Sequence, residues 1–497
     1  MALDFIEKEP LIILAKNKSQ FKNNFIMTEK LPKRQNALVF QGGGALGAYE
    51  AGFFEAVYEK LEKEKKHKQP FDLIVGTSIG AINGAILVSY YKKHNSWIGS
   101  SEHLKKFWLH LSSKTVFSDL FTEMWYSWRK FFPNSPTKEE SRRLFSVNEF
   151  LYRGVPNVFT PPKLRFDFPF YGLDSPWYQS SNEGLKQSLE KFIDFPISTE
   201  YEKNEPRLLL VSVDVQESLP VVFDSYKKPD GTRSTLYGQS TSADGKAEGG
   251  YLVEYDGVEV DHVLASASVP LNYDYTKITA KEITGTDSSK GKQVTRYLWD
   301  GGLLHNTPMT PLLVAHKKFW DNRLGIKEKR DAIFNGKSEN ELKIPELHAY
   351  VVDMWAKKSK EVPRTRNQTK SRYYEIMYSD KTEYEERVMA VFDDLVNLSK
   401  NLIDFSKQKG ATKKELEKIL MSDIETPFYI GVKRSYVDLL AGTFPVKVSR
   451  IQRSEDPDDI ADQAFDFSLQ TIKTLFEEGY DDTKKHLKNL KKEDSLD

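Results

Sequence analysis

Residues 37–54 read ALVFQGGGALGAYEAGFF, a short apolar run that meets three consecutive glycines before a series of helix-forming residues. This order predicts a buried strand, a tight turn and a helix. Within the turn, Gly42, Gly44 and Gly47 have the G-x-G-x-x-G spacing of dinucleotide sites, where backbone amides hold a pyrophosphate. Such amides also stabilise other oxygen anions, so the rest of the chain must decide between the two interpretations.

A second glycine turn follows, and it carries a serine. Residues 75–82 read VGTSIGAI, in which Gly76, Ser78 and Gly80 form G-x-S-x-G between an apolar strand and an apolar helix. In this context the serine occupies a sharp turn that presents its hydroxyl group at the edge of the sheet. The first amides of the following helix point to the same place, which suits an anion that forms during acyl transfer.

The position of this serine argues against a dinucleotide site. Such a site needs an acidic residue at the end of the second strand to hold the ribose, and here the nearby Asp72 precedes that strand. Both glycine turns open at the carboxyl edge of one parallel sheet. We therefore interpret the amides around Gly43 and Gly44 as an oxyanion hole for chemistry at Ser78.

A serine nucleophile needs a base, and the segment LWDGGLLHNTP offers one. Asp300 stands where a strand ends, and Gly301 and Gly302 form a turn directly after it. A partly desolvated carboxylate at this place could accept the serine proton directly. The alternative is an α/β-hydrolase-like esterase with a Ser-His-Asp triad, in which His305 or His348 is the base.

The motifs GGGALG, GTSIGA, ASASVP and DGG occur in the order and context of the patatin-like phospholipase family, which the chain resembles over roughly residues 37–320. The resemblance implies an α/β fold with three layers, a mostly parallel central sheet and lipid acyl hydrolysis by a Ser–Asp dyad. It assigns Ser78 as the nucleophile and Asp300 as its base. Many members carry Arg before the last glycine of the first motif, where this chain has Leu46, which puts headgroup recognition at that position in doubt. The implied oxyanion motif comprises Gly42, Gly43, Gly44 and Gly47.

The resemblance and the composition together divide the chain into three parts. Residues 1–36 are polar and predicted to form an N-terminal tail, and residues 37–356 are predicted to form the acyl-hydrolase domain. Residues 357–497 are charge-rich and predicted to form a mainly helical C-terminal extension. Within the domain, residues of about 97–182 are predicted to form an aromatic insertion or lid.

The aromatic part of this insertion has two interpretations. Helix-spaced aromatic residues usually belong to a buried core. The second half also resembles a surface-seeking amphipathic segment, because Arg129 and Lys130 lie among its aromatic residues. The residues concerned are Trp97, Phe107, Trp108, Phe117, Phe121, Trp125, Tyr126, Trp128, Phe131 and Phe132.

Composition excludes several classes of function. Lys plus Arg and Asp plus Glu both number 72, so no overall charge favours nucleic acid. The chain has no cysteine, which excludes disulfides and thiolate metal sites. No apolar run reaches the length of a membrane span, so we expect a cytoplasmic protein whose contact with membranes is peripheral and transient.

The predicted chemistry needs no cofactor or metal, and its partner is a lipid or another fatty-acyl ester. A non-catalytic lipid-binding protein is the alternative outside the enzymes.

Overall fold

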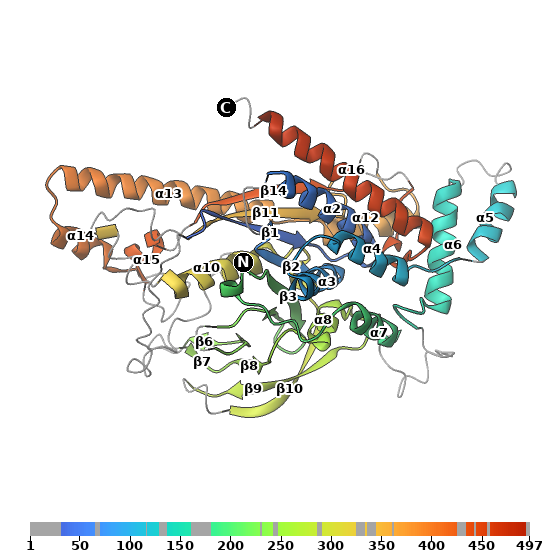
Figure 1. Cartoon of the computed structure of the whole chain (residues 1–497), viewed down its shortest axis with the longest axis horizontal. Coiled ribbons are helices and arrows are strands. Elements are labelled where there is room, and N and C mark those ends of the chain that lie inside the picture. Colours follow the sequence, from blue (N-terminus) through green and yellow to red (C-terminus); the bar gives the residue numbers. More distant parts are fainter. Residues whose placement is uncertain are drawn as a thin grey trace.

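The computed structural model describes residues 31–64, 70–115, 117–128, 137–160, 180–228, 231–241, 247–285, 291–324, 333–334, 344–359, 362–424, 434–441, 444–454 and 458–493 (Figure 1). Its strands are β1 (Arg34–Phe40), β2 (Leu73–Thr77), β3 (Arg207–Asp214), β4 (Leu219–Asp224), β5 (Ser234–Tyr237), β6 (Ser240–Thr241), β7 (Ala247–Glu248), β8 (Tyr251–Glu254), β9 (Thr276–Ile283), β10 (Gly291–Asp300), β11 (Glu346–Asp353), β12 (Asp423–Ile424), β13 (Arg434–Ser435) and β14 (Val446–Gln452). Its α-helices are α2 (Gly47–Glu64), α3 (Ile79–His94), α4 (Ser100–Leu111), α5 (Phe117–Trp128), α6 (Lys138–Arg153), α7 (Glu183–Phe192), α8 (Val260–Ala267), α9 (Gly302–His305), α10 (Met309–Leu324), α12 (Arg366–Tyr378), α13 (Glu383–Gln408), α14 (Lys413–Leu420), α15 (Tyr436–Ala441) and α16 (Leu469–Glu493).

One large mixed sheet organises the chain. Its strands follow the order β14-β11-β1-β2-β3-β10-β9-β8-β5, and β4 pairs with β3 outside this path. The strands from β14 to β3 are parallel, whereas β3, β10, β9, β8 and β5 are joined by antiparallel pairing. The parallel strands β1 and β2 are buried almost throughout, because helices cover both of their faces.

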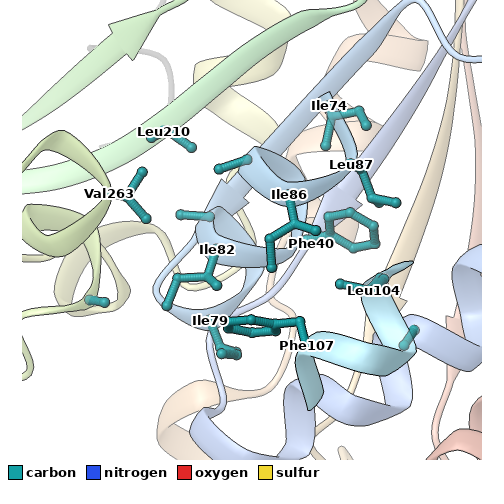
Figure 2. Close-up of a cluster of buried hydrophobic side chains, with 14 of the residues drawn as sticks. Phe40, Ile74, Ile79, Ile82, Ile86, Leu87, Leu104, Phe107, Leu210 and Val263 are labelled. Atoms are coloured by element: carbon teal, nitrogen blue, oxygen red, sulfur yellow. The ribbon is translucent and has the colours of Figure 1, made fainter. Parts of the chain in front are cut away.

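Alternate residues of β1 enter two different cores, as the two-residue repeat of a strand requires. Leu38 and Phe40 pack in the larger core with side chains of α2, α3 and α4, part of which Figure 2 shows around Phe40 and Phe107. Ala37 and Val39 pack on the opposite face with α10. The α/β class, the central sheet between helical layers and the mainly helical C-terminal region are confirmed.

The last third of the chain returns to this sheet. β14 pairs with β11 as the outermost parallel strand, and α16 packs along α2. The two helices touch at glycines, since a Cβ atom at Gly52 would lie 2.1 Å from the carbonyl oxygen of Phe476, and one at Gly479 would lie 2.0 Å from that of Tyr49. The sheet therefore continues across the limit at residues 356 and 357. The domain limits taken from the sequence stay predictions.

Two groups of helices extend from opposite ends of the molecule (Figure 1). At one end, α13, α14 and α15 share a small core of their own. Its buried members are Val396, Ile403, Leu416, Leu420, Val437 and Leu440. At the other end lie α5 and α6, which pack against each other.

The aromatic segment divides between core and surface. Phe107 and Trp108 of α4 are fully buried. In α5, by contrast, Phe121, Trp125 and Tyr126 are 41, 41 and 42% exposed. Residues 129–136, which include two of the predicted aromatic residues and both cationic ones, lie outside the described part, as do residues 1–30. No helix in the described part combines the length and the apolarity that a membrane crossing needs.

Candidate active site

Ser78 lies at the turn between β2 and α3, as the sequence predicts for a nucleophile turn. Its backbone has φ 57° and ψ −125°, a conformation that a non-glycine residue adopts only under strain. The neighbouring glycines make the turn sterically feasible. A Cβ atom at Gly76 would lie 2.2 Å from the carbonyl oxygen of Gly80, and one at Gly80 would lie 2.7 Å from that of Phe40. This strained serine between close-packed glycines has the geometry of a nucleophile elbow.

A second serine holds the elbow in place. The Ser78 amide donates to Ser266 Oγ at 3.1 Å, and Ser266 Oγ donates to the carbonyl oxygen of Val211 at 2.6 Å. Ser266 belongs to α8 and comes from the ASASVP segment, to which sequence reasoning gave no individual role. The bond to the main chain of β3 fixes the Ser266 hydroxyl group, so the elbow is tied to the neighbouring strand.

Asp300 ends β10, the strand that pairs with β3 on its antiparallel side. Its amide donates to the carbonyl oxygen of Ser268 at 2.9 Å, and its Oδ1 accepts from the Gly302 amide at 2.7 Å. The α8 region thus contacts the backbone of both predicted catalytic residues. Gly301 lies against β3, where a Cβ atom would be 2.2 Å from the carbonyl oxygen of Val211.

The carboxylate of Asp300 is almost completely buried and faces Ser78. Burial raises the pKa of Asp300 to about 6, while the nearby Ser78 hydroxyl group and the Gly302 amide limit the rise. Within the described residues, no hydrogen bond of regular geometry reaches Asp300 Oδ2. Because the Ser78 hydroxyl group is close enough to affect the pKa of Asp300, the two side chains are neighbours. Asp300 Oδ2 is available to accept a proton. A loose contact of this kind is common in active sites without substrate.

The glycine loop lies beside the elbow because β1 and β2 are adjacent parallel strands, with Phe40 opposite Gly76. A Cβ atom at Gly42 would lie 3.2 Å from Ser78 Cβ. The Gly42 amide donates to the carbonyl oxygen of Asn306 at 3.2 Å and is already used. The amides of Gly43 and Gly44 donate to no group among the described residues.

The rear of the glycine loop rests on a buried polar group. Glu50 Oε1 accepts from the Gln41 amide at 2.7 Å, and its Oε2 accepts from Asn83 Nδ2 at 2.8 Å. Asn83 Nδ2 also donates to the carbonyl oxygen of Gly47 at 3.0 Å. Burial raises the pKa of Glu50 well above its usual range. This role of Glu50 was not predicted, although an acidic residue among the small and apolar residues of GAYEAGFF is a usable signal.

Leu46 and the two candidate histidines make contacts that are typical of residues with a structural role. Leu46 is fully buried in the larger core. His348 Nε2 lies 2.9 Å from Ser449 Oγ, and its ring stacks on Tyr350 with centroids 4.5 Å apart. His305 accepts a hydrogen bond at its carbonyl oxygen from Thr77 Oγ1 at 2.8 Å, and burial lowers the pKa of its ring to about 4. Across the described residues, no group of three or more His, Asp or Glu side chains is arranged to hold a metal ion.

The chain is similar to known proteins by three kinds of comparison. An uncharacterized protein, L620, of Acanthamoeba polyphaga mimivirus is 22% identical over 305 residues, which cover 60% of this chain and 68% of the relative. Among solved structures, VipD from Legionella pneumophila aligns over 93% of this chain and 68% of its own length. The identity there is 10% and the TM-score is 0.27, a value that supports no conclusion by itself. The family model described as patatin-like phospholipase matches residues 38–313, more than half of the chain. The chain therefore belongs to the patatin-like phospholipase family, a family of lipid acyl hydrolases.

Proposed function

We propose that the protein is a serine acyl hydrolase that cleaves fatty-acyl esters of lipids through a Ser78–Asp300 dyad and an acyl-enzyme. One observation carries the proposal. A strained elbow serine faces a buried carboxylate, and two amides lie in the adjacent glycine loop. Among the described residues, the second carboxylate oxygen accepts no regular hydrogen bond and the two amides donate to no group. Nucleophile, base and anion-stabilising donors are the three parts that acyl transfer needs.

In the first half-reaction, Asp300 takes the proton of the Ser78 hydroxyl group as Oγ attacks the ester carbonyl carbon. The carbonyl oxygen becomes an oxyanion, which the amides of Gly43 and Gly44 stabilise. Each such donor typically lowers the barrier by about 3–4 kcal/mol. The bond to the alcohol oxygen then breaks, and the alcohol leaves with the proton that Asp300 held. The fatty-acyl group remains on Oγ.

The second half-reaction repeats these steps with water. Asp300 accepts a proton from a water molecule as the water oxygen attacks the acyl carbon. The same two amides stabilise the second oxyanion. The bond between the acyl carbon and Ser78 Oγ breaks, Oγ recovers the proton, and the free fatty acid leaves. No step of this scheme draws on a metal or a cofactor.

The environment of Asp300 suits it to this task. An ordinary aspartate, with a pKa near 3.8, is a weak base for a hydroxyl group. Burial raises the pKa of Asp300 to about 6, which makes the carboxylate more basic and still leaves it mostly ionised at neutral pH.

The substrate class that we propose includes phospholipids, lysophospholipids and acylglycerols. Phospholipase A, lysophospholipase and acylglycerol lipase activities all use the same acyl-transfer step. Leu46 offers no cation to a phosphate. We further propose a cytoplasmic enzyme that meets its substrate at membranes through α5, whose exposed Trp125 and Tyr126 are residue types enriched at lipid interfaces.

Two variants and one covalent probe test the proposal. A fluorophosphonate should label wild-type protein at Ser78, and Ser78→Ala should lose both labelling and release of fatty acid from phospholipid vesicles. Asp300→Asn should lose turnover while His305→Ala and His348→Ala retain it. Turnover that survives in Asp300→Asn but not in a histidine variant would establish a triad. Lipid binding without labelling or fatty-acid release would establish a non-catalytic lipid-binding protein.

A further inference from the structure

The described contacts of the glycine loop lead into the C-terminal third of the chain. Asn306, six residues after Asp300, holds both polar groups of Gly42. Its carbonyl oxygen accepts from the Gly42 amide at 3.2 Å, and its Nδ2 donates to the Gly42 carbonyl oxygen at 3.3 Å. A Cβ atom at Gly42 would lie 2.4 Å from Asn306 Oδ1, so the two residues are in direct contact. The position of the Gly42 peptide groups therefore follows the position of Asn306.

Asn306 is in turn held by a main-chain carbonyl group of the C-terminal region. Asn306 Nδ2 donates to the carbonyl oxygen of Tyr378 at 2.7 Å, and Gln41 Nε2 donates to the same oxygen at 3.1 Å. Gln41 precedes Gly42 in the chain. The Tyr378 carbonyl oxygen therefore accepts one hydrogen bond from the residue before the glycine loop and one from Asn306, which holds Gly42. Trp355 Nε1 completes the support by donating to the Gly42 carbonyl oxygen at 2.8 Å.

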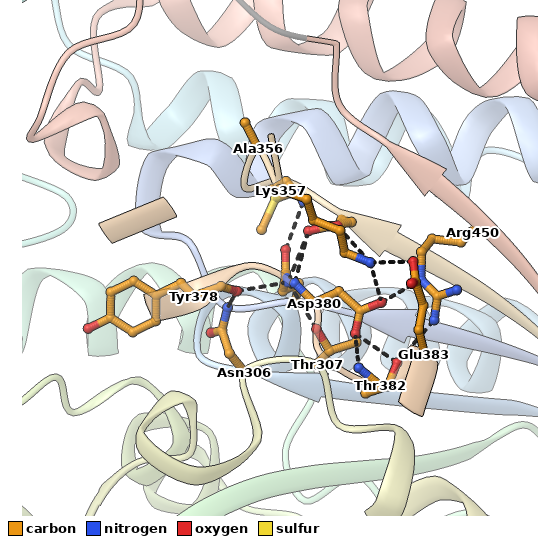
Figure 3. Close-up of polar contacts among 12 residues, drawn as sticks. Asn306, Thr307, Ala356, Lys357, Tyr378, Asp380, Thr382, Glu383 and Arg450 are labelled. Carbon is orange, nitrogen blue, oxygen red and sulfur yellow. Dashed lines mark hydrogen bonds and ion pairs between the residues drawn. The ribbon is translucent and has the colours of Figure 1, made fainter. Parts of the chain in front are cut away.

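Tyr378 ends α12, and the short turn that follows is fixed by an ion cluster around the buried Asp380 (Figure 3). Asp380 Oδ1 accepts from the amide and the hydroxyl group of Thr382 at 2.9 and 2.7 Å. Asp380 Oδ2 pairs with Arg450 of β14 and lies 3.6 Å from Lys357 Nζ. Arg450 also pairs with Glu386 on α13.

The charges in this cluster depend on one another. Burial acts to raise the pKa of Asp380, but Arg450, Thr382 and Lys357 hold it below its usual range. The Asp380 amide donates to Asp353 Oδ1 at 3.3 Å. Loss of the Arg450 guanidinium group would leave the Asp380 carboxylate buried without its main partner, and the turn would have to rearrange to hydrate it.

We infer that Asn306, the turn 378–382 and Arg450 together form a positioning device for the oxyanion loop. The inference rests on the proposed function for its catalytic meaning. None of these residues contacts the reacting atoms in the scheme above. They act by keeping the Gly42 peptide groups, and hence the amides of Gly43 and Gly44, at the place that the oxyanion of the substrate occupies. The C-terminal region is accordingly a structural support of the active site.

The expected effect falls on kcat. A shift of about 1 Å in a catalytic group costs as much as 100-fold in rate, whereas ground-state binding of the acyl chain does not use these amides. Asn306→Ala and Arg450→Gln should each lower kcat about 10- to 100-fold on a soluble p-nitrophenyl ester, with KM changed less than about 3-fold. Asp380→Asn keeps the shape and the Thr382 contacts, so its loss of kcat should be smaller.

A matched control comes from α13, the helix that carries Glu386. Arg387→Gln makes the same exchange as Arg450→Gln, but the Arg387 side chain is 79% exposed and pairs only with Glu383 at 3.8 Å among the described residues. We expect its kcat and KM to equal those of the wild type. Thermal unfolding of all variants shows whether each one is folded at the assay temperature.

Hydrogen–deuterium exchange of peptides that cover residues 41–47 tests the placement without any turnover. Exchange there should be at least about 10-fold faster in Asn306→Ala and Arg450→Gln than in the wild type and Arg387→Gln, because the loop loses its anchor. Unchanged exchange and unchanged kcat in folded variants would overturn the inference. Faster exchange in a protein whose wild type releases no fatty acid would uphold the placement and reject the proposed function.

Discussion

Replacing Asp300 with asparagine should abolish turnover and at the same time stabilise the protein at neutral pH. The burial that raises the pKa of Asp300 from 3.8 to about 6 favours the protonated form in the folded chain. Between these two values the folded chain holds a proton that the unfolded chain releases. The free energy of unfolding therefore falls as the pH rises through this window, and it stays low above about pH 6.

The magnitude follows from the width of the window. A difference of about two pKa units corresponds to about 3 kcal/mol over the whole window, and about 1.4 kcal/mol of it lies between about pH 7.5 and about pH 5. Asp300→Asn has no proton to release at this position and keeps an oxygen to accept from the Gly302 amide. Its advantage in unfolding free energy over the wild type should therefore shrink by about 1.4 kcal/mol between these two pH values.

Urea unfolding followed by tryptophan fluorescence at the two pH values measures this difference, since the chain has eight tryptophans. Ser78→Ala is the matched control, because it is expected to be equally inactive but keeps the buried carboxylate, so its pH dependence should follow the wild type. A wild-type and an Asp300→Asn protein whose unfolding free energies respond equally to pH would show that the carboxylate is not desolvated as described.

In the wild type, kcat/KM should fall about tenfold from neutral pH to about pH 5, as the base becomes protonated.

Three further predictions concern the nucleophile elbow and the exposed face of α5. Ser78→Gly should be more stable than Ser78→Ala by about 1 kcal/mol in urea unfolding, because glycine relieves the positive φ; equal stabilities would argue against strain at the elbow. Ser266→Ala should lower kcat about tenfold with little change in KM, since it frees the Ser78 amide from its anchor; an unchanged kcat would limit Ser266 to packing. Trp125→Ala should reduce hydrolysis of phospholipid vesicles several-fold but leave hydrolysis of a soluble ester unchanged, and equal loss on both substrates would exclude an interfacial role for α5.

The first half of the fold could be predicted because its signals are local. Apolar runs end in glycines at β1 and β2, and helical spacing follows each of them. The glycines around Ser78 are there because no Cβ atom fits, which makes the elbow visible in the sequence. Asp300 was predictable from its place before two glycines, together with the family resemblance.

The support behind the glycine loop could not be predicted in the same way. Tyr378 contributes a main-chain carbonyl group, which every residue type possesses, so no side chain marks it. The partnership of Asp380 with Arg450 joins residues seventy positions apart, and only the pairing of β14 with β11 brings them together. The aromatic segment shows a further limit, because Trp108 of α4 is fully buried whereas Trp125 of α5 is 41% exposed, and the residue type alone does not separate the two.

The order of strands in the sheet has a consequence for synthesis of the protein. β1 is among the first described residues to leave the ribosome, but its neighbour β11 emerges about three hundred residues later, and β14 about a hundred residues after that. A nascent chain that ends between residues 300 and 346 carries Ser78 and Asp300 but has neither the outer parallel strands nor Arg450. Under the proposed scheme, hydrolytic activity toward the lipids of the cell that makes it would begin only after β14 has been synthesised.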